Sequence, residues 1–320
     1  MNYKPIIIVP GEPNSVFLEI FFKTIRNKKF KNPIILICSE KLLIMQMKKL
    51  KFNFKVNLVN KNNSFLKLKK NQINLINVNY TPNKAFEKIT SKSSKYIEKC
   101  FIIALNLIKI GVSNKLLNGP ISKKYFLKKK YLGMTEYLTK KSNSKNSVML
   151  IYNKKLSVSP MTTHLPIKLV SKKINKIEII KKIQLIYRFY KKILKFSPRI
   201  AVTGLNPHCE SIDNFNEDVK IIKPSIKVLK SMGIKVQGPF SADTIFLKNN
   251  RKKFNVIVGM YHDQVLTPVK TLYEYDAINI TLGLPFIRVS PDHGPNEKML
   301  GKNQSNPLSL FKSLEFLDKH

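Results

Sequence analysis

The chain has 320 residues, 43% of them hydrophobic, and a formal net charge of +39 at pH 7. This length is sufficient for one large or two medium α/β domains around a buried core. Only five of the basic residues are arginines, and the lysines are spread along the whole chain. This argues against a dedicated nucleic-acid surface and indicates solvated faces that attract anionic substrates.

Cysteine usage and the most apolar segments bear on the cellular compartment. The three cysteines, Cys38, Cys100 and Cys209, include no Cys-x-x-Cys pair, which fits a reduced cytosol. The chain opens on a short strand-like segment, residues 6–9, rather than on a signal peptide. The longest apolar stretch, residues 101–110, is too short to cross a bilayer. We therefore expect a cytoplasmic protein without a membrane anchor.

Short apolar runs alternate along the chain with longer helix-like segments. Strands are expected at residues 6–9, 34–38, 54–59, 148–152, 156–159, 200–203, 256–259 and 277–281. Helices are expected at residues 15–24, 40–50, 81–110 and 174–196. The alternation predicts α/β layers in which ligands bind at the carboxyl ends of the strands. No glycine-rich phosphate-binding loop and no internal repeat is visible in the sequence.

Three histidines follow apolar strand-like runs within compact turn motifs. His164 lies in Thr-Thr-His-Leu-Pro, His208 in Asn-Pro-His and His262 in Tyr-His-Asp-Gln. Three neutral imidazoles suit a catalytic divalent metal with an open coordination position. The alternative is that one or more is an ordinary loop histidine, and for any single histidine that alternative is the stronger one. Asp263 follows His262 and is placed to orient that ligand or to bind a water molecule.

Further along the chain than His262, three side chains offer charge and hydrogen bonds to an anionic ligand. They are Lys270, Asn279 and Arg288. Lysine is too common in this chain for Lys270 to be informative by itself. Arg288 follows the apolar run Leu-Pro-Phe-Ile, and a partly buried arginine needs an anionic partner. That partner is either an internal carboxylate or a ligand phosphate or carboxylate gripped through two parallel hydrogen bonds.

Longer motifs run in order through nearly the whole chain, with only a weak match between residues 14 and 115. They are Pro10-Gly11-Glu12-Pro13, Asn118-Gly119-Pro120, Thr162-Thr163-His164-Leu165-Pro166, Gly204-Leu205-Asn206-Pro207-His208, Gly238-Pro239 with Ala242-Asp243-Thr244, Met260-Tyr261-His262-Asp263-Gln264, residues 279–288 and Asp292-His293-Gly294. Together they resemble the PdxA family, the 4-hydroxythreonine-4-phosphate dehydrogenases of vitamin B6 biosynthesis.

The resemblance implies a ligand for each part of the site. It implies a divalent metal, in a site shared between the subunits of a homodimer, bound by His164, His208 and His262. It implies a phosphorylated amino-acid substrate contacted by Thr135, Lys270, Asn279 and Arg288. It places NAD, with NADP as the alternative, at His293, Gly294 and Gly301. Zinc is the first expectation for the metal, followed by magnesium or cobalt.

The family's fold is similar to that of isocitrate and isopropylmalate dehydrogenases, which bind NAD without the usual glycine fingerprint. This similarity implies an α/β protein with two α/β/α subdomains and a cleft between them. One subdomain is expected to comprise residues 1–125 and 265–320, with both termini and part of the NAD site. The other, residues 126–264, is expected to carry the dimer interface and the metal ligands.

The activity implied is the NAD-dependent oxidation of 4-phosphooxy-L-threonine to 2-amino-3-oxo-4-phosphooxybutanoate. This β-keto acid then loses carbon dioxide to give 3-amino-2-oxopropyl phosphate. The metal would lower the pKa of the substrate alcohol, and NAD would accept the hydride. Asp243 and Asp263 are candidates for catalytic proton-relay roles, with a structural cap as the alternative for Asp243.

One departure from the family pattern lies in the expected substrate pocket. The family's substrate-contacting His-Thr pair appears here as Met134-Thr135, and methionine can neither carry charge nor donate a strong hydrogen bond. An altered pocket keeps open a dehydrogenase of a related sugar acid, such as 4-phospho-threonate or 4-phospho-erythronate. A second alternative is a basic RNA-associated protein without catalytic activity.

Overall fold

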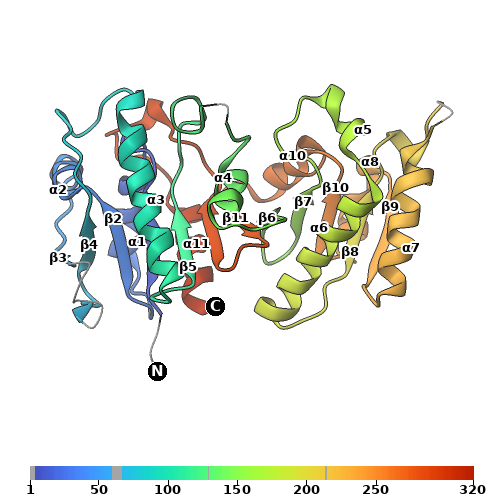
Figure 1. The fold of residues 1–320 in the computed structure, drawn as a ribbon, viewed down its shortest axis with the longest axis horizontal. Helices are drawn as coiled ribbons and strands as arrows, with labels where there is room; N and C mark the ends of the chain where they lie inside the picture. Colours follow the sequence, from blue (N-terminus) through green and yellow to red (C-terminus); the bar gives the residue numbers. More distant parts are fainter. Residues whose placement is uncertain (1–3, 60–66, 129, 213–214) are drawn as a thin grey trace. The chain divides into compact units, whose positions relative to one another are not determined.

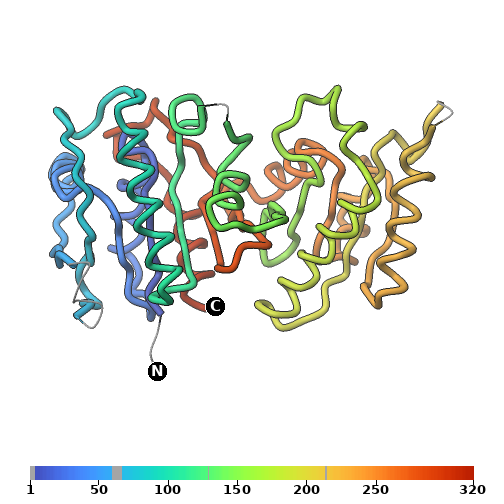
Figure 2. The backbone as a smooth tube through the Cα atoms, in the orientation of Figure 1, coloured from blue at the N-terminus to red at the C-terminus, as the bar shows by residue number. Residues whose placement is uncertain are grey.

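The computed structural model describes residues 4–59, 67–128, 130–212 and 215–320, and the chain divides into two compact units. Unit 1 comprises Met1–Tyr131 and Pro285–His320, and unit 2 comprises Leu132–Leu284. Figure 2 follows the chain from the first segment of unit 1 through unit 2 and back. Among the described residues, each unit is an α/β structure with six strands.

The sheet of unit 1 is parallel throughout its described pairings. Its strands, in spatial order, are β3 (Val56–Leu58), β4 (Ile73–Asn77), β2 (Ile34–Cys38), β1 (Ile6–Val9), β5 (Lys115–Asn118) and β12 (Ile287–Pro291). All four residues of β1 are fully buried, as expected for a parallel strand covered on both faces.

Helices cover both faces of this sheet. They are α1 (Phe17–Asn27), α2 (Glu40–Lys49), α3 (Ser94–Lys109) and α11 (Leu308–Lys319). The α3 helix packs on β1 and β2, whereas α11 packs on β5 and β12 (Figure 1). The start of α2 is fixed by Ser39, whose side chain accepts a hydrogen bond from the backbone N–H of Leu42.

The sheet of unit 2 is mixed. Its strands, in spatial order, are β11 (Ile278–Leu282), β6 (Val148–Tyr152), β7 (Ser157–Pro160), β10 (Val256–Gly259), β8 (Ile200–Thr203) and β9 (Val236–Phe240). Antiparallel pairing joins β11 to β6 and β6 to β7, so the strands expected at residues 148–152 and 156–159 form a hairpin. From β7 to β9 the strands are parallel, and their carboxyl ends lie at one edge.

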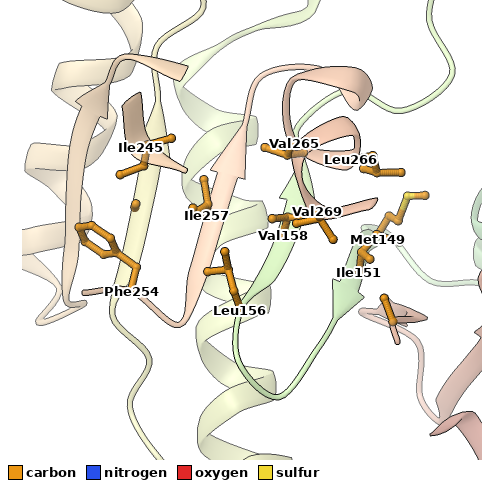
Figure 3. Packing of buried hydrophobic residues seen from close by; sticks show 12 residues of the cluster. Met149, Ile151, Leu156, Val158, Ile245, Phe254, Ile257, Val265, Leu266 and Val269 are labelled. Carbon is orange, nitrogen blue, oxygen red and sulfur yellow. The ribbon is translucent and has the colours of Figure 1, made fainter. Parts of the chain in front are cut away.

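The core of unit 2 lies around β7 and β10. Ile257 of β10 and Val158 of β7 pack against Val265 and Val269 of α10 (His262–Tyr273), as Figure 3 shows. The α6 helix (Lys176–Phe189) packs on β6 and β11, and α7 (Lys223–Ser231) packs on β9. The smaller helices of this unit are α4 (Met134–Lys141), α5 (Val170–Lys173), α8 (Ala242–Ile245) and α9 (Lys248–Arg251).

Two expectations differ from the structure. The helix expected at 81–110 begins only after residue 90, as a short 3-10 turn at Ser91–Ser93 followed by α3, because Thr90 rather than Thr81 caps it. Residues 265–284 belong to unit 2 rather than to the terminal segment, because α10 packs on β7 and β11 pairs with β6.

In the described ranges, no helix has the length and apolar character needed to cross a membrane.

Candidate metal and substrate site

Three neighbouring parallel strands of unit 2 end in the loops that carry the histidines. The order of these strands is β7, β10 and β8. His164 follows β7, His262 begins α10 directly after β10, and His208 follows β8. The carboxyl ends of adjacent parallel strands meet at one edge, which is where α/β proteins bind ligands.

The structure brings His164 and His262 together. Their ring centroids are 5.8 Å apart and the rings are inclined by 37°. Nδ1 of His262 lies 2.6 Å from Oδ1 of Asp263, and the Asp263 side chain is 81% exposed. A carboxylate bonded to one ring nitrogen fixes the tautomer and leaves Nε2 to act as a metal ligand. Asp263 is therefore in contact with the ring that it is predicted to orient.

His208 is not grouped with the other two imidazoles. It is exposed, with φ of 52°, and Cys209 after it also has a positive φ of 63°. Among the described residues of one chain, no cluster of three or more His, Cys, Asp or Glu side chains is arranged to hold a metal ion. Within the described part of one chain, His164 and His262 are therefore the two of the three expected ligands that lie close together.

Main-chain bonds connect the loop of His164 to the loop of His262. The backbone N–H and the hydroxyl of Thr162 both donate to the carbonyl of Met260, at 3.1 and 2.9 Å. The backbone N–H of Met161 donates to the carbonyl of Gly259 at 2.7 Å. These bonds continue the pairing of β7 with β10 past the strand ends, which explains why the two imidazoles lie close together.

A pocket of about 470 Å³ lies beside the His164 loop, within unit 2. Glu136 lines it and accepts a hydrogen bond of 3.3 Å from the hydroxyl of Thr163. Lys182 also lines it and donates to the carbonyl of Met161 at 2.6 Å, and burial lowers the pKa of its ammonium group. Neither residue was singled out in the sequence, because Lys and Glu on helices are usually solvated.

Two of the predicted substrate residues are connected by β11, because Thr135 contacts this strand and Asn279 belongs to it. Thr135, buried in α4, has its hydroxyl 3.3 Å from the hydroxyl of Thr281. Asn279 is on the same strand, and its Oδ1 is buried without a hydrogen-bond partner among the described residues. Lys270 lies in the last turn of α10. Met134 begins α4, directly before Thr135.

Arg288 lies in unit 1, on β12, and is only 2% exposed. Its Nε donates to Oδ1 of Asn118 at 2.7 Å, and Asn118 donates in turn to the carbonyl of Gly119 at 2.8 Å. The Asn-Gly-Pro motif at the end of β5 is therefore the internal support of Arg288. The sequence of this motif does not by itself reveal its contact with Arg288.

The expected cofactor residues also lie in unit 1. Nδ1 of His293 is 2.9 Å from the carbonyl oxygen of Gly294, and a Cβ added to Gly294 would meet no atom within 4 Å. Gly301 has a positive φ of 72° and packs against the ring of Phe86.

In unit 2, Asp243 is exposed in the first turn of α8. No described contact connects Asp243 with the histidines.

Glu12 of unit 1 is a buried carboxyl group that the sequence alone did not identify. It is 1% exposed, and its Oε2 accepts a hydrogen bond of 3.1 Å from the hydroxyl of Ser93. Burial raises its pKa from 4.5 to about 7, with a further contribution from the negative charge of Glu297. Glu12 therefore titrates in the neutral range.

The chain is similar to known proteins along most of its length. The family model of pyridoxal phosphate biosynthetic protein PdxA matches residues 29–317. A 4-hydroxythreonine-4-phosphate dehydrogenase of Sulfurihydrogenibium sp. (strain YO3AOP1) is 36% identical over 318 residues, covering 97% of this chain and 96% of that protein. A D-threonate 4-phosphate dehydrogenase of Pectobacterium atrosepticum is 34% identical over 220 residues, covering 68% of each.

A solved structure of similar architecture supports the same assignment. The crystal structure of 4-hydroxythreonine-4-phosphate dehydrogenase from Klebsiella pneumoniae superposes with a TM-score of 0.83 at 26% identity and covers 98% of each chain. The α/β fold expected from the sequence is thereby confirmed. With the family model matching most of its length, the chain belongs to the PdxA family of pyridoxal phosphate biosynthetic proteins.

Proposed function

We propose that this protein oxidises 4-phosphooxy-L-threonine with NAD and releases carbon dioxide to form 3-amino-2-oxopropyl phosphate, within pyridoxal 5'-phosphate biosynthesis. The observation that carries the proposal is the pair of imidazoles at His164 and His262, 5.8 Å apart at adjacent strand ends. The names of the relatives supply the substrate class, since the full-length relative is a 4-hydroxythreonine-4-phosphate dehydrogenase.

The donor set fits a divalent metal. Neutral imidazoles suit zinc first, with cobalt as a close alternative, whereas magnesium prefers oxygen ligands. His164 and His262 would hold the ion, and we propose that His208 completes the set in a homodimer whose site is shared between subunits. When bound, the metal supplies Lewis acidity toward the substrate alcohol. Asp263 holds the His262 ring in one tautomer through its 2.6 Å contact.

The remaining residues bind and orient the substrate in this proposal. Arg288 and Lys270 contribute positive charge for the phosphate or the carboxylate, and Thr135 and Asn279 contribute hydrogen bonds. Holding both ends of the substrate aligns the reacting carbon for hydride transfer. Asp243 remains a candidate for proton relay and is exposed in the structure.

NAD is the proposed hydride acceptor, with NADP as the alternative. The loop at His293 and Gly294 supports this, because the space beside Gly294 is open, and Phe86 backs Gly301 at its positive φ. A nicotinamide cofactor also agrees with the dehydrogenase names of the relatives.

A second substrate is favoured by two observations. One relative is a D-threonate 4-phosphate dehydrogenase, and the resemblance to the family implies a substrate-contacting histidine where this chain has Met134. A pocket without that imidazole could accept an acid that lacks the amine.

The experiment is to measure NADH formation by metal-loaded protein with 4-phosphooxy-L-threonine and with D-threonate 4-phosphate. We expect the larger kcat/KM with 4-phosphooxy-L-threonine. A strong preference for D-threonate 4-phosphate would overturn the first assignment in favour of the second. No NADH with either compound, together with RNA binding that weakens steeply with salt, would support the non-catalytic alternative.

A further inference from the structure

Gln264 makes three side-chain hydrogen bonds at the carboxyl ends of β8 and β10. Its Oε1 accepts from the backbone N–H of Met260 at 2.7 Å and from the hydroxyl of Thr203 at 2.8 Å. Its Nε2 donates to the carbonyl of Gly204 at 2.8 Å. The orientation of the amide follows from these partners, because an N–H needs an acceptor and a carbonyl needs a donor.

These bonds connect the loops that carry two of the three histidines. Gln264 lies in the first turn of α10, two residues after His262. Its partners Thr203 and Gly204 lie at the end of β8, in the stretch that leads to His208. A single amide therefore fixes the distance between the start of the His208 loop and the start of α10.

The backbone around Gln264 is adapted to its position. A Cβ added to Gly259, at the end of β10, would lie 3.0 Å from Oε1 of Gln264 and 2.4 Å from Cγ1 of Val265. Only glycine lets α10 begin this close to β10. The amide is thus packed against the strand end as well as hydrogen-bonded to it.

A buried carboxylate holds the same stretch from the other side. Asp218, which is fully buried, accepts from the backbone N–H groups of Leu205 and Asn206 at 2.8 and 3.1 Å. It also accepts from the side-chain amide of Asn206 at 3.0 Å. With Gly204 held by Gln264, every residue from 203 to 206 is anchored, and the loop becomes exposed only at Pro207 and His208.

We propose that Gln264 is a positioning residue for the metal site. By tying Thr203 and Gly204 to Met260, it sets the separation of the loops that carry His208 and His262. This separation in turn determines the affinity for the metal. The inference rests on the proposed function, because it takes these histidines as metal ligands. Where His208 serves the site of the partner subunit, as proposed above, Gln264 acts on both sites, because it holds the His208 loop and the start of α10 of its own chain in place. Groups hydrogen-bonded directly to metal ligands typically contribute 10- to 100-fold in metal affinity. Gln264 contacts the backbone beside the ligands instead, so its effect is expected at the lower end of this range.

The test compares zinc affinities of the full-length protein, measured by competition with a chromophoric chelator, in the wild type and in Gln264→Met. Methionine has similar length and cannot replace the three bonds. We expect zinc binding to weaken by roughly 10-fold. The visible spectrum of the cobalt(II)-loaded protein should also change, because the ligand geometry changes. Gln184→Met, the same substitution on α6, is the matched control and should keep the wild-type affinity and spectrum.

Thr203→Val is a milder variant that removes one bond of the three and keeps the shape of the side chain. It should weaken zinc binding by less than Gln264→Met does, and it keeps the test decisive if that variant does not fold. Wild-type affinity and an unchanged cobalt spectrum in either folded variant would overturn the inference. Failure of the proposed function is a different result, because wild-type protein would then bind no zinc through its histidines.

Discussion

The guanidinium group of Arg288 is held in the interior of unit 1 by the side-chain amide of Asn118. Its Nε donates to Oδ1 of Asn118, which is itself buried. A lysine would keep the charge, lose the planar fork and leave Oδ1 of Asn118 without this donor. We expect Arg288→Lys to lower kcat/KM by roughly 30- to 150-fold. This corresponds to a loss of about 2–3 kcal/mol in transition-state binding. Steady-state kinetics beside the exposed control Arg199→Lys measure this, and equal values for the two variants would contradict the role.

Glu12 gives a prediction about pH, because its folded-state pKa of about 7 lies above its ordinary value of 4.5. A raised carboxyl pKa contributes stability that is fully present below pH 4.5 and is lost as the pH rises through 7. Glu12→Gln lacks this titration. The free energy of unfolding of the wild type should therefore fall by about 3 kcal/mol relative to Glu12→Gln between pH 4 and pH 8.

Urea unfolding of the two proteins across this pH range makes the Glu12 measurement. The control is Glu98→Gln, the same substitution at an exposed position of α3. A constant difference between the wild type and Glu12→Gln would show that burial does not raise the carboxyl pKa.

The junction between β10 and α10 is the element on which the site depends most. It ends one strand, starts the helix at His262 and leaves no room beside Gly259. Gly259→Ala should lower the free energy of unfolding by about 1–3 kcal/mol, because the added methyl group overlaps Val265. Thermal unfolding measures the change. Gly294→Ala is the matched control, since its Cβ meets no atom within 4 Å, and an equal melting temperature for the two variants would contradict the packing.

Elements with a strong local signal were predictable from the sequence. The buried strands β1, β2 and β10 lie where continuous apolar runs predicted them, and the residues at the ends of β7, β8 and β10 include the expected histidines. The start of α3 was not predictable, because the Thr-Pro signal at residues 81–82 competes with the cap at Thr90. The boundary between the units depends on the pairing of β11 with β6, which is a long-range contact.

The supporting residues of the site could not be predicted for a related reason. Gln264, Asp218 and Glu136 are polar residues on helical segments, where a side chain is usually solvated. Their roles arise from partners far away in sequence, such as Thr203 for Gln264 and Thr163 for Glu136. The motif around His262 did include Gln264, so position in a motif was the one available signal.

At the scale of the whole molecule, the proposed shared metal site predicts that metal binding and dimerisation are coupled. If two copies of the 37.0 kDa chain complete one site, zinc must stabilise the dimer. Sedimentation should show tighter self-association with zinc than with a chelator, and His208→Ala should abolish the difference. A dimer whose dissociation is unaffected by zinc would contradict a shared site.

The central claim is that the histidines at the strand ends of unit 2 support a metal- and NAD-dependent oxidation. The most direct measurement is NADH formation from 4-phosphooxy-L-threonine by metal-free protein, before and after zinc is added back. The account predicts that zinc restores NADH formation in the wild type but not in His164→Ala or His262→Ala, while the His320→Ala control behaves as the wild type. Zinc-dependent NADH formation that persists in either of these two histidine variants would contradict it.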